Sequence, residues 1–425
     1  MTPADGIDAA LRRAGLPPLP RTAWLAIDLD CLVANLRVLR AALPRGVRVE
    51  PVVKADAYGH GAVPTAIALA AAGADGFGVA TLDEAQELRE AGIGLPILVL
   101  YPVPPAAAEL AAAGAIAVTL GEETLIEQTL AALPARLAAP LDVHLEIETG
   151  LGRGGVDPTR AAVAARRLGG DSRIRPIGVW THLGTPGDPI RSAAQHRRFD
   201  EALAGLAAAG WPAGRVHVAA SGGILAAAAP PHDAVRPGLS LYGLAPDGLP
   251  VAAPLAAAAG ALAPVLSLHA RPVRVADLPT GAGIGYGNGF VTDRPSRIAT
   301  LPIGYADGYR RAWGARARVL VRGNRAALVG GVAMDAVMVD VTDVPGSPVT
   351  VGDEFVLLGE QGADRIDAFE LAHIGTTISW EVLAGMARRL PRVYYAGAVP
   401  TALRTLTEGR EPWHSAGINE PRART

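Results

Sequence analysis

Apolar runs with the character of β-strands alternate with alanine- and leucine-rich stretches of helical spacing between about residue 20 and residue 250. In one such stretch, TLDEAQELREAG (81–92), Thr81 precedes Glu84 by three residues, the pattern of a capping box at a helix start. Strands that alternate with helices predict a parallel sheet covered by helices. About eight such units over ~230 residues favour a closed (β/α)8 barrel over an open sheet. The predicted strands are 48–55, 75–81, 96–103, 115–120, 142–148, 175–183, 215–220 and 234–244.

The pattern changes after about residue 256. Short, β-branched runs such as RVLVRG (318–323) and EFVLLGE (354–360) are separated by turn residues and predict a mainly antiparallel β domain, which one helical stretch (367–386) interrupts. The predicted fold is therefore α/β, with an N-terminal (β/α)8 TIM-type barrel and a C-terminal mainly-β domain. Four divisions are predicted: an N-terminal extension at 1–20, the barrel at 21–255, the β domain at 256–406 and a tail at 407–425. Both ends of the chain are expected to be poorly ordered.

Composition narrows the class of protein. The 425 residues exceed what one core usually holds, and 50% hydrophobic residues with a formal net charge of −2 indicate a soluble globular protein without an electrostatic bias toward nucleic acid. The single cysteine, Cys31, excludes an intramolecular disulfide framework and a multi-thiolate metal site. The N-terminus has no apolar signal core, and the uncharged stretch 251–267 contains two prolines. We therefore expect a cytoplasmic protein without a membrane span, in which this stretch is a linker.

Polar side chains recur where the predicted barrel strands end. Each alone would most often be a solvated loop residue or an ion pair at the barrel rim. Barrel enzymes, however, carry their chemistry at the carboxyl ends of the strands, so several such residues on one rim predict an active site. The five residues are Lys54 at the end of the first strand, Arg153 after the fifth, His182 at the end of the sixth, Ser221 past the seventh and Arg236 on the eighth.

The loops after the seventh and eighth strands read SGG (221–223) and RPG (236–238). Their glycines let backbone N–H groups approach an anion, and barrels often hold a phosphate between these two loops. On this signal alone the ligand could equally be a sugar phosphate. A phosphate site opposite a strand-end lysine suggests pyridoxal 5′-phosphate, with Lys54 as its Schiff-base partner.

Several stretches resemble the alanine racemase family, whose members are fold-type III pyridoxal-phosphate enzymes. The resemblance spans roughly residues 20–400 and is most specific in VKADAYGHG (53–61), LPIGYADG (301–308) and MDAVMVD (334–340). It implies an N-terminal barrel, a C-terminal β domain, bound pyridoxal phosphate and a homodimer in which each active site borrows residues from the partner. The implied activity is the interconversion of L- and D-alanine, which supplies D-alanine for cell-wall peptidoglycan. Further matching stretches are AIDLDCLVANL (26–36), GVWTHLGT (178–185), VRPGLSLYGL (235–244) and IGYGNGF (284–290).

Racemisation removes the α-proton from one face of the substrate and returns a proton to the other, which two acid–bases on opposite faces achieve directly. By resemblance these are Lys54 and Tyr286, the tyrosine coming from the partner subunit. Arg236 matches an arginine that faces the pyridine nitrogen, and since a guanidinium only donates, that nitrogen should stay unprotonated. The alternative explanation for Met334 is core packing. The alternative explanation for Tyr305 is an aromatic residue in a turn with no role in the site. The family pattern assigns the cofactor to Lys54, Tyr58, His182, Ser221, Arg236, Gly238 and Leu239, and the substrate to Arg153, the Met334 amide and Tyr305.

The sequence departs from the family pattern at two places. The family segment L-K-x-D-T-G-M-x-R, whose lysine is often carbamylated, is LEIETGLGR (145–153) here, so Glu146 takes the lysine position. A glutamate is negative at pH 7 without modification and can keep the charge that orients Arg153, although its shorter stem predicts a water or a shifted loop between them. In GMARRLPR (385–392), Arg388 takes the place of a tyrosine that walls off the alanine methyl group. Serine, or a broader range of amino acids, is therefore the alternative substrate.

Two other functions fit a related architecture. Basic amino-acid decarboxylases resemble racemases in fold and use a cysteine of the C-terminal domain as acid, but no cysteine follows Cys31 here. Non-catalytic pyridoxal-phosphate carriers are single barrels, whereas this chain has a second domain and Tyr286. A racemase is the preferred interpretation.

Overall fold

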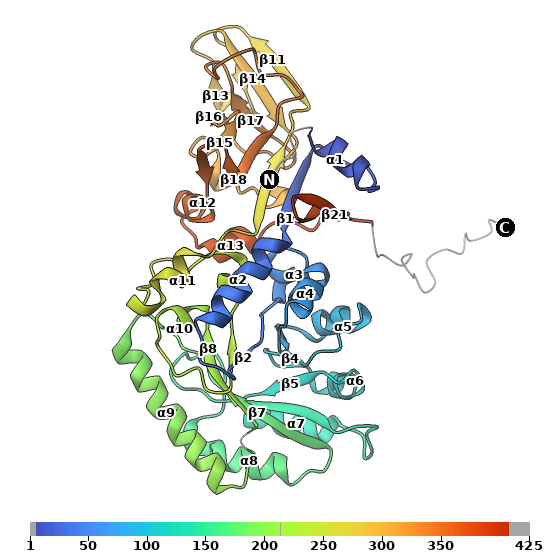
Figure 1. The fold of residues 1–425 in the computed structure, drawn as a ribbon, viewed down its shortest axis with the longest axis vertical. Helices are drawn as coiled ribbons and strands as arrows, with labels where there is room; N and C mark the ends of the chain where they lie inside the picture. Colours follow the sequence, from blue (N-terminus) through green and yellow to red (C-terminus); the bar gives the residue numbers. More distant parts are fainter. Residues whose placement is uncertain (1–5, 213, 408–425) are drawn as a thin grey trace, which may run out of the picture.

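The protein is described by a computed structural model, which covers residues 6–212 and 214–407. Figure 1 shows a barrel at one end of the molecule and a β domain at the other, with the amino-terminal helix beside the β domain. The predicted fold class, an α/β barrel followed by a mainly-β domain, is confirmed. Within the described ranges, no helix is long and apolar enough to cross a membrane.

Eight parallel strands form the barrel in the order β2-β9-β8-β7-β6-β5-β4-β3. A parallel bridge joins Val52, which follows β2, to Gly78 in β3, and so closes the sheet. All eight predicted strands are present, although several are shorter than predicted. The last ends at Arg236 and continues as a 3₁₀ turn, η3 (Leu239–Tyr242). The strands are β2 (Arg48–Val49), β3 (Phe77–Val79), β4 (Ile97–Val99), β5 (Ala117–Leu120), β6 (Leu141–Glu146), β7 (Ile174–Trp180), β8 (Arg215–Ala220) and β9 (Ala234–Arg236).

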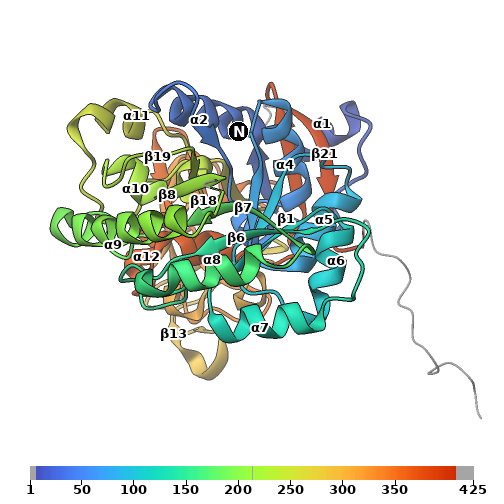
Figure 2. The ribbon, with the colours of Figure 1, turned by 90° about the horizontal axis from the view of Figure 1, so that it is seen from below.

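Helices cover the outside of the barrel, and Figure 2 shows α7, α8 and α9 across it in the view from below. Polar side chains cap the amino ends of α2, α5 and α9: at α2, for example, the Asp28 carboxylate accepts the Cys31 N–H at 2.9 Å. The predicted capping box is present, since the Glu84 carboxylate accepts the Thr81 N–H at 3.3 Å. The helices are α2 (Leu29–Ala41), α4 (Ala62–Ala71), α5 (Leu82–Glu90), α6 (Ala108–Ala113), α7 (Glu123–Ala132), α8 (Ala161–Gly169), α9 (Pro189–Ala208) and α10 (Ser221–Leu225).

A second sheet, in the order β11-β14-β17-β16-β15-β18-β10-β1-β20-β21 with β19 on β18, forms the β domain. The sequence predicts residues 21–28 in the barrel, but β1 (Ala23–Asp28) lies in this sheet between β10 and β20. The sequence analysis predicted no strand at these residues, which are nearly continuously buried in this sheet. A hairpin, β12 (Gly283–Ile284) and β13 (Phe290–Val291), forms a separate two-stranded sheet. The other strands are β10 (Leu266–Ala270), β11 (Arg274–Leu278), β14 (Ser296–Leu301), β15 (Arg318–Val321), β16 (Asn324–Val329), β17 (Val337–Asp340), β18 (Phe355–Gln361), β19 (Asp364–Ile366), β20 (Arg392–Ala396) and β21 (Val399–Arg404).

Three segments differ from expectation. In the N-terminal extension, expected to be poorly ordered, α1 (Ile7–Arg13) is an amphipathic helix whose apolar face packs on β1 and the last two strands. The expected linker at 251–267 contains a short helix, α11 (Ala256–Gly260). The helical stretch 367–386 is two helices, α12 (Ala368–Gly375) and α13 (Ser379–Ala384), because Thr376 adopts a left-handed φ of 53°. The predicted tail at 407–425 lies outside the described residues, except for its first residue.

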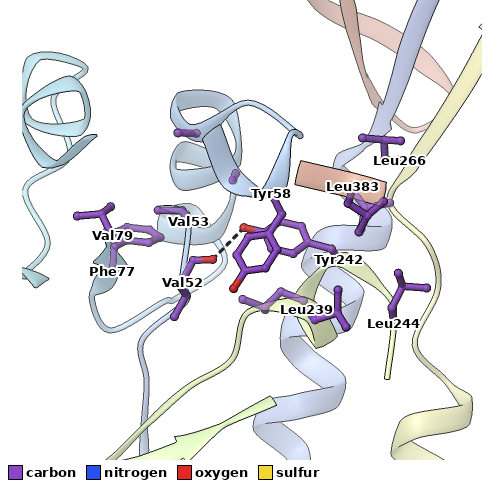
Figure 3. Packing of buried hydrophobic residues seen from close by; sticks show 14 of the residues in the cluster. Val52, Val53, Tyr58, Phe77, Val79, Leu239, Tyr242, Leu244, Leu266 and Leu383 are labelled. Carbon is purple, nitrogen blue, oxygen red and sulfur yellow. Dashed lines mark hydrogen bonds between the residues drawn. The ribbon is translucent and has the colours of Figure 1, made fainter. Parts of the chain in front are cut away.

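One hydrophobic core continues from the barrel into the β domain, as Figure 3 shows. The rings of Tyr58 and Tyr242 lie 4.9 Å apart, and the Tyr242 hydroxyl donates to the Val52 carbonyl at 3.0 Å. Leu266 of β10 and Leu383 of α13 belong to the same cluster. The segment that carries Lys54 therefore rests on a core to which both domains contribute.

Candidate active site

A cavity of about 790 Å³ lies at the carboxyl ends of the barrel strands. Its wall is built from the segments after β2, β4, β6, β7, β8 and β9, and from α13 of the β domain. The strand-end prediction therefore identified side chains that do meet in space. Every predicted site residue of the barrel lines this cavity: Lys54, Tyr58, Arg153, His182, Ser221, Arg236, Gly238 and Leu239.

Lys54 is the only lysine in the 425-residue sequence. Burial lowers the pKa of its amine, the charges of Arg153 and Arg236 lower it further, and the Glu84 carboxylate opposes them. A lowered pKa makes more of the amine neutral, which is the form that acts as nucleophile or base. The lysine count is a second sequence signal for this position, independent of its place at a strand end.

The backbone immediately after Lys54 turns in the left-handed sense. Ala55, Asp56, Ala57 and Tyr58, which belong to α3 (Lys54–Tyr58), each have a φ of 54°. For L-residues this conformation costs roughly 1–2 kcal/mol per residue, so surrounding contacts must hold it. One of these contacts comes from α5, where Glu84 accepts the Ala55 N–H at 2.6 Å.

Hydroxyl and backbone donors gather on the wall formed by α10 and η3. The Ser221 Oγ accepts the N–H groups of Gly238 at 3.0 Å and of Ser240 at 3.1 Å, and its own O–H is a further donor. A side chain at Gly238 would collide with the Tyr58 hydroxyl, so glycine lets the phenol lie against the backbone. Burial raises the pKa of Tyr58 to about 12, which keeps its hydroxyl a donor. This donor set fits a phosphate, although the Gly238 N–H points to Ser221 in the structure.

Arg236 is fully buried and held from several sides. Its Nη2 donates to the carbonyls of Thr181 at 2.9 Å and Val218 at 3.1 Å, and its guanidinium carbon lies 4.7 Å from the Trp180 ring centroid. Burial lowers the pKa of Arg236 to about 10, so it stays charged at neutral pH. Its orientation is therefore set by the barrel strands themselves.

Two buried histidines continue this network. Arg236 donates through Nη1 to Nδ1 of His217, whose Nε2 lies 2.9 Å from Nδ1 of His144. Because the guanidinium can only donate, His217 accepts at Nδ1 and carries its proton on Nε2, which donates to His144. Burial lowers the pKa of both rings, that of His144 to about 3, so both are neutral. The sequence analysis did not identify this pair. The signal that could have indicated it is a histidine between two apolar residues in each of two strands.

His182 and Glu146 complete the electrostatics of the cavity. Burial lowers the pKa of His182 to about 3, with Arg236, Arg153 and Lys54 contributing, so this imidazole is neutral. Glu146 is 7% exposed, and its Oε1 lies 3.7 Å from Nη2 of Arg153. Burial raises the pKa of Glu146, while Arg153 and Arg236 oppose that rise. The shorter stem of glutamate led us to expect that direct contact would need a water or a shifted loop; in the structure the two side chains form an ion pair at 3.7 Å.

Tyr101, after β4, is a cavity residue that the sequence analysis did not identify. Its ring centroid lies 5.9 Å from the Lys54 Nζ and 5.4 Å from the Arg153 guanidinium carbon, within cation–π range of both. From the β domain, Trp380 and Ala384 of α13 also line the cavity. Only the position of Tyr101 at a strand end could have indicated it.

The three predicted site residues of the β domain do not line the cavity of their own chain. Tyr286 is 91% exposed beside the β12–β13 hairpin, Met334 is 52% exposed and Tyr305 is 38% exposed. Met334 and Tyr305 are neighbours, since the Ala306 N–H donates to the Met334 carbonyl at 3.1 Å. Arg388 is also outside the cavity, with its Nη2 3.5 Å from Oε1 of Glu87.

The fold and the cavity define a two-domain barrel protein of the kind that carries its chemistry at the strand ends, with one lysine amine and two guanidinium groups lining one cavity. Comparison with known families is more specific: the family description "Alanine racemase, N-terminal domain" matches residues 27–246, and "Alanine racemase, C-terminal domain" matches residues 265–394. The chain belongs to the alanine racemase family and is an isomerase of that class.

Individual relatives are similar in sequence or structure to this chain along nearly its whole length. The alanine racemase of Symbiobacterium thermophilum is 43% identical over 377 residues, covering 88% of this chain and 97% of that protein, and that of Halothermothrix orenii is 40% identical over 384 residues with the same coverage. The crystal structure of the Bacillus anthracis alanine racemase with bound L-Ala-P has a TM-score of 0.84 at 32% identity, covering 92% of this chain and 99% of that one. A histidine racemase from Leuconostoc mesenteroides has a TM-score of 0.79 at 29% identity, covering 89% and 99%. Membership of this family decides against the decarboxylase and the carrier.

We expect the Lys54 amine of the cofactor-free protein to titrate below the ordinary range of a lysine, because burial and two guanidinium groups disfavour the ammonium. Reductive methylation with isotopically labelled formaldehyde marks only Lys54 and the α-amino group, so an NMR titration can follow Lys54 alone. Arg153→Met should raise this pKa by removing one opposing charge. A wild-type pKa at or above the ordinary lysine range would contradict the described surroundings.

Proposed function

We propose that the protein interconverts L- and D-alanine with pyridoxal 5′-phosphate attached to Lys54, in the cytoplasm, and so supplies D-alanine for cell-wall peptidoglycan. The observation that carries the proposal is the placement of the chain's only lysine in one cavity with a set of phosphate-compatible donors. When bound, this cofactor withdraws electrons from the Cα of an attached amino acid and makes the α-proton acidic. The protein's own residues must then hold both molecules and move the proton.

The barrel supplies the groups that would hold the cofactor. The Tyr58 and Ser221 hydroxyls and the backbone at Gly238 and Leu239 would bind the phosphate. By the family pattern, His182 would lie beside the second base, the partner subunit's Tyr286. Arg236 would face the ring nitrogen as a fixed donor, because its other bonds to the barrel strands leave it little freedom to turn. A donor at that place leaves the nitrogen unprotonated.

The barrel offers one base, Lys54, on one face of the substrate. The second base would be the partner subunit's Tyr286, with the partner's Met334 amide and Tyr305 beside it, in a homodimer with shared sites. The observation that supports this is the exposure of all three side chains outside their own cavity. Large apolar and aromatic side chains exposed together are typical of an interface.

Arg153 would bind the substrate carboxylate, and Glu146 would fix its position. The direct Glu146–Arg153 ion pair supplies a permanent charge where the family pattern has a lysine that is often carbamylated. Glu148 shapes the same loop, since its carboxylate accepts the N–H groups of Gly150 and Gly152. The loop that carries Arg153 is therefore held by two carboxylates.

A broader substrate range is the second candidate, and the position of Arg388 favours it. Because that side chain turns to Glu87, the wall expected from this position of the family pattern does not reach the cavity. A hydrophobic pocket discriminates one methylene by only ~1–3 kcal/mol, so a missing wall admits larger side chains. The ratio of kcat/KM for alanine to that for serine, lysine, arginine and histidine separates the two candidates.

Removing either base should have a distinct effect. Lys54→Ala should lose the visible absorbance of attached cofactor and all racemisation, since no other lysine can replace it. Tyr286→Phe should keep that absorbance but racemise about 10²–10⁴-fold more slowly, the usual contribution of a positioned acid–base. In deuterated water it should still deuterate one enantiomer with retention, because Lys54 alone can exchange the proton on its face. Tyr309→Phe, at a buried tyrosine outside the cavity wall, is the matched control. Wild-type racemisation by Tyr286→Phe would refute the two-base assignment.

Shared active sites predict complementation between two inactive variants. An equimolar mixture of Lys54→Ala and Tyr286→Phe protomers should regain about a quarter of wild-type activity after subunit exchange, because each mixed dimer contains one intact site. Wild-type specific activity should also fall on dilution below the dimer dissociation constant. No recovery in a mixture that forms mixed dimers, measured by native mass spectrometry, would mean that each chain builds its own site.

Glu146→Gln should raise KM for alanine several-fold, with a smaller decrease in kcat, because it loosens Arg153 without removing a base. Wild-type activity should not depend on dissolved carbon dioxide or bicarbonate. Glu127→Gln, which breaks the surface pair with Arg167, should leave both constants unchanged. An unchanged KM in Glu146→Gln would show that this carboxylate does not position Arg153.

A further inference from the structure

The left-handed turn after Lys54 needs an external restraint. Among the described residues it is the only run of consecutive non-glycine residues with positive φ; the others are isolated single positions. Four such residues at roughly 1–2 kcal/mol each store several kcal/mol of backbone strain. Without a compensating contact, the turn would relax toward right-handed values and change the direction of the chain on leaving Lys54.

The strongest restraint comes from the last two described strands of the chain. Arg404, at the end of β21, forms a two-pronged ion pair with Asp56 in the turn, with Nη1–Oδ1 at 2.8 Å and Nη2–Oδ2 at 2.6 Å. The two residues are 348 positions apart in sequence. Figure 1 shows β21 beside α3 and α4, and Figure 2 shows it beside α4. Such bidentate guanidinium–carboxylate pairs fix orientation as well as distance.

The contacts around this pair explain why it is rigid. Asp56 Oδ1 also accepts the Ala62 N–H at 2.9 Å, which ties the turn to the start of α4. Arg392 of β20, 1% exposed, donates from Nε to the Gly59 carbonyl at 2.9 Å and lies 3.9 Å from Asp56. A side chain at Gly61 would collide with the Tyr394 hydroxyl, so the β20–β21 hairpin packs directly on the turn.

The charges of the cluster are also coupled. Burial alone would raise the pKa of Asp56, but the hydrogen bonds and charge of Arg404, helped by Arg392, outweigh it and lower the pKa. Asp56 is therefore a carboxylate at neutral pH, and it is the acidic partner of both guanidinium groups. Breaking the pair leaves partly buried charges without a partner, which is costly.

We propose that Arg404 is a positioning residue for Lys54: through its pair with Asp56 it holds the left-handed turn and so fixes the direction from which the Lys54 amine enters the cavity. Tyr58, the last residue of the turn, would be positioned by the same contact. Arg404 lies beyond residues 265–394, where the family's C-terminal description matches, so the family resemblance does not point to it. The inference rests on the proposed role of Lys54 as the cofactor-binding lysine and base.

The first test follows Lys54 without turnover. The rate at which cofactor-free protein attaches pyridoxal phosphate, read from the visible absorbance and from borohydride trapping at the single lysine, should fall about 10- to 100-fold in Arg404→Ala, since a misplacement of about 1 Å can cost that much. Arg404→Lys keeps the charge but not the two-pronged geometry, and should recover part of the loss. Asp56→Asn should resemble Arg404→Ala, and the double variant should be no worse than either single one, because both remove the same contact.

A matched control separates positioning from general stability. Arg325 forms a comparable pair in the β domain, with Asp364 at 2.8 Å and Glu370 at 2.7 Å, away from the turn. Arg325→Ala should lower the melting temperature without slowing cofactor attachment. In Arg404→Ala that does fold, kcat should fall more than KM rises, because the base is displaced while Arg153 is untouched.

The outcomes distinguish the two proposals. Attachment and kcat at wild-type rates in Arg404→Ala, or additive effects of Asp56→Asn and Arg404→Ala, would overturn the positioning role while leaving the proposed function intact. If Arg404→Ala does not fold, wild-type attachment rates in both Arg404→Lys and Asp56→Asn would overturn it equally. Cofactor attachment and racemisation that survive in Lys54→Ala would instead overturn the proposed function itself.

Discussion

Three basic side chains, Lys54, Arg153 and Arg236, line one cavity, and this excess of positive charge governs the rest of the site. Each charge must be compensated or fixed, since like charges in a low-dielectric site repel strongly. Arg236 is fixed by carbonyls and a neutral histidine, Arg153 by Glu146, and Lys54 by a lowered pKa. Burial, with this field added to it, lowers the pKa of His182 and keeps it neutral. An anionic ligand is the group that such a cavity can accommodate at least cost, which fits both a phosphate and an amino-acid carboxylate.

The two domains are not independent units in this architecture. β1, from the start of the chain, pairs with β20 from its end, and the chain enters α2 of the barrel directly from β1. The hydrophobic core continues across the junction, and α13 contributes Trp380 to the wall of the barrel cavity. The strained turn at Lys54 lies where these connections meet. The β domain therefore bears on the geometry of the barrel's active end as well as carrying residues of its own.

Much of this structure could be predicted, because parallel barrel strands leave strong local signals. All eight barrel strands and the residues at their carboxyl ends followed from alternation and from the rule that barrels act at one rim. What the sequence did not reveal depends on long-range pairing. No strand was predicted at β1, and its pairing with β10 and β20 has no local signature. The same holds for Tyr101 and for the His217–His144 pair, whose partners lie far away in sequence.

The exposed position of Tyr286 bears on where the second base of the proposed reaction comes from. In the proposed reaction a planar, cofactor-bound substrate has two faces, and Lys54 would act on one of them. The chain's own Tyr286 does not line the cavity. In that reaction the base for the opposite face would come from another molecule or from a large movement of the β domain. The shared core and the Arg404–Asp56 pair hold the β domain to the barrel, so a second subunit is the less costly source. The contact proposed to position Lys54 thus also supports the proposal that the second base comes from outside the chain.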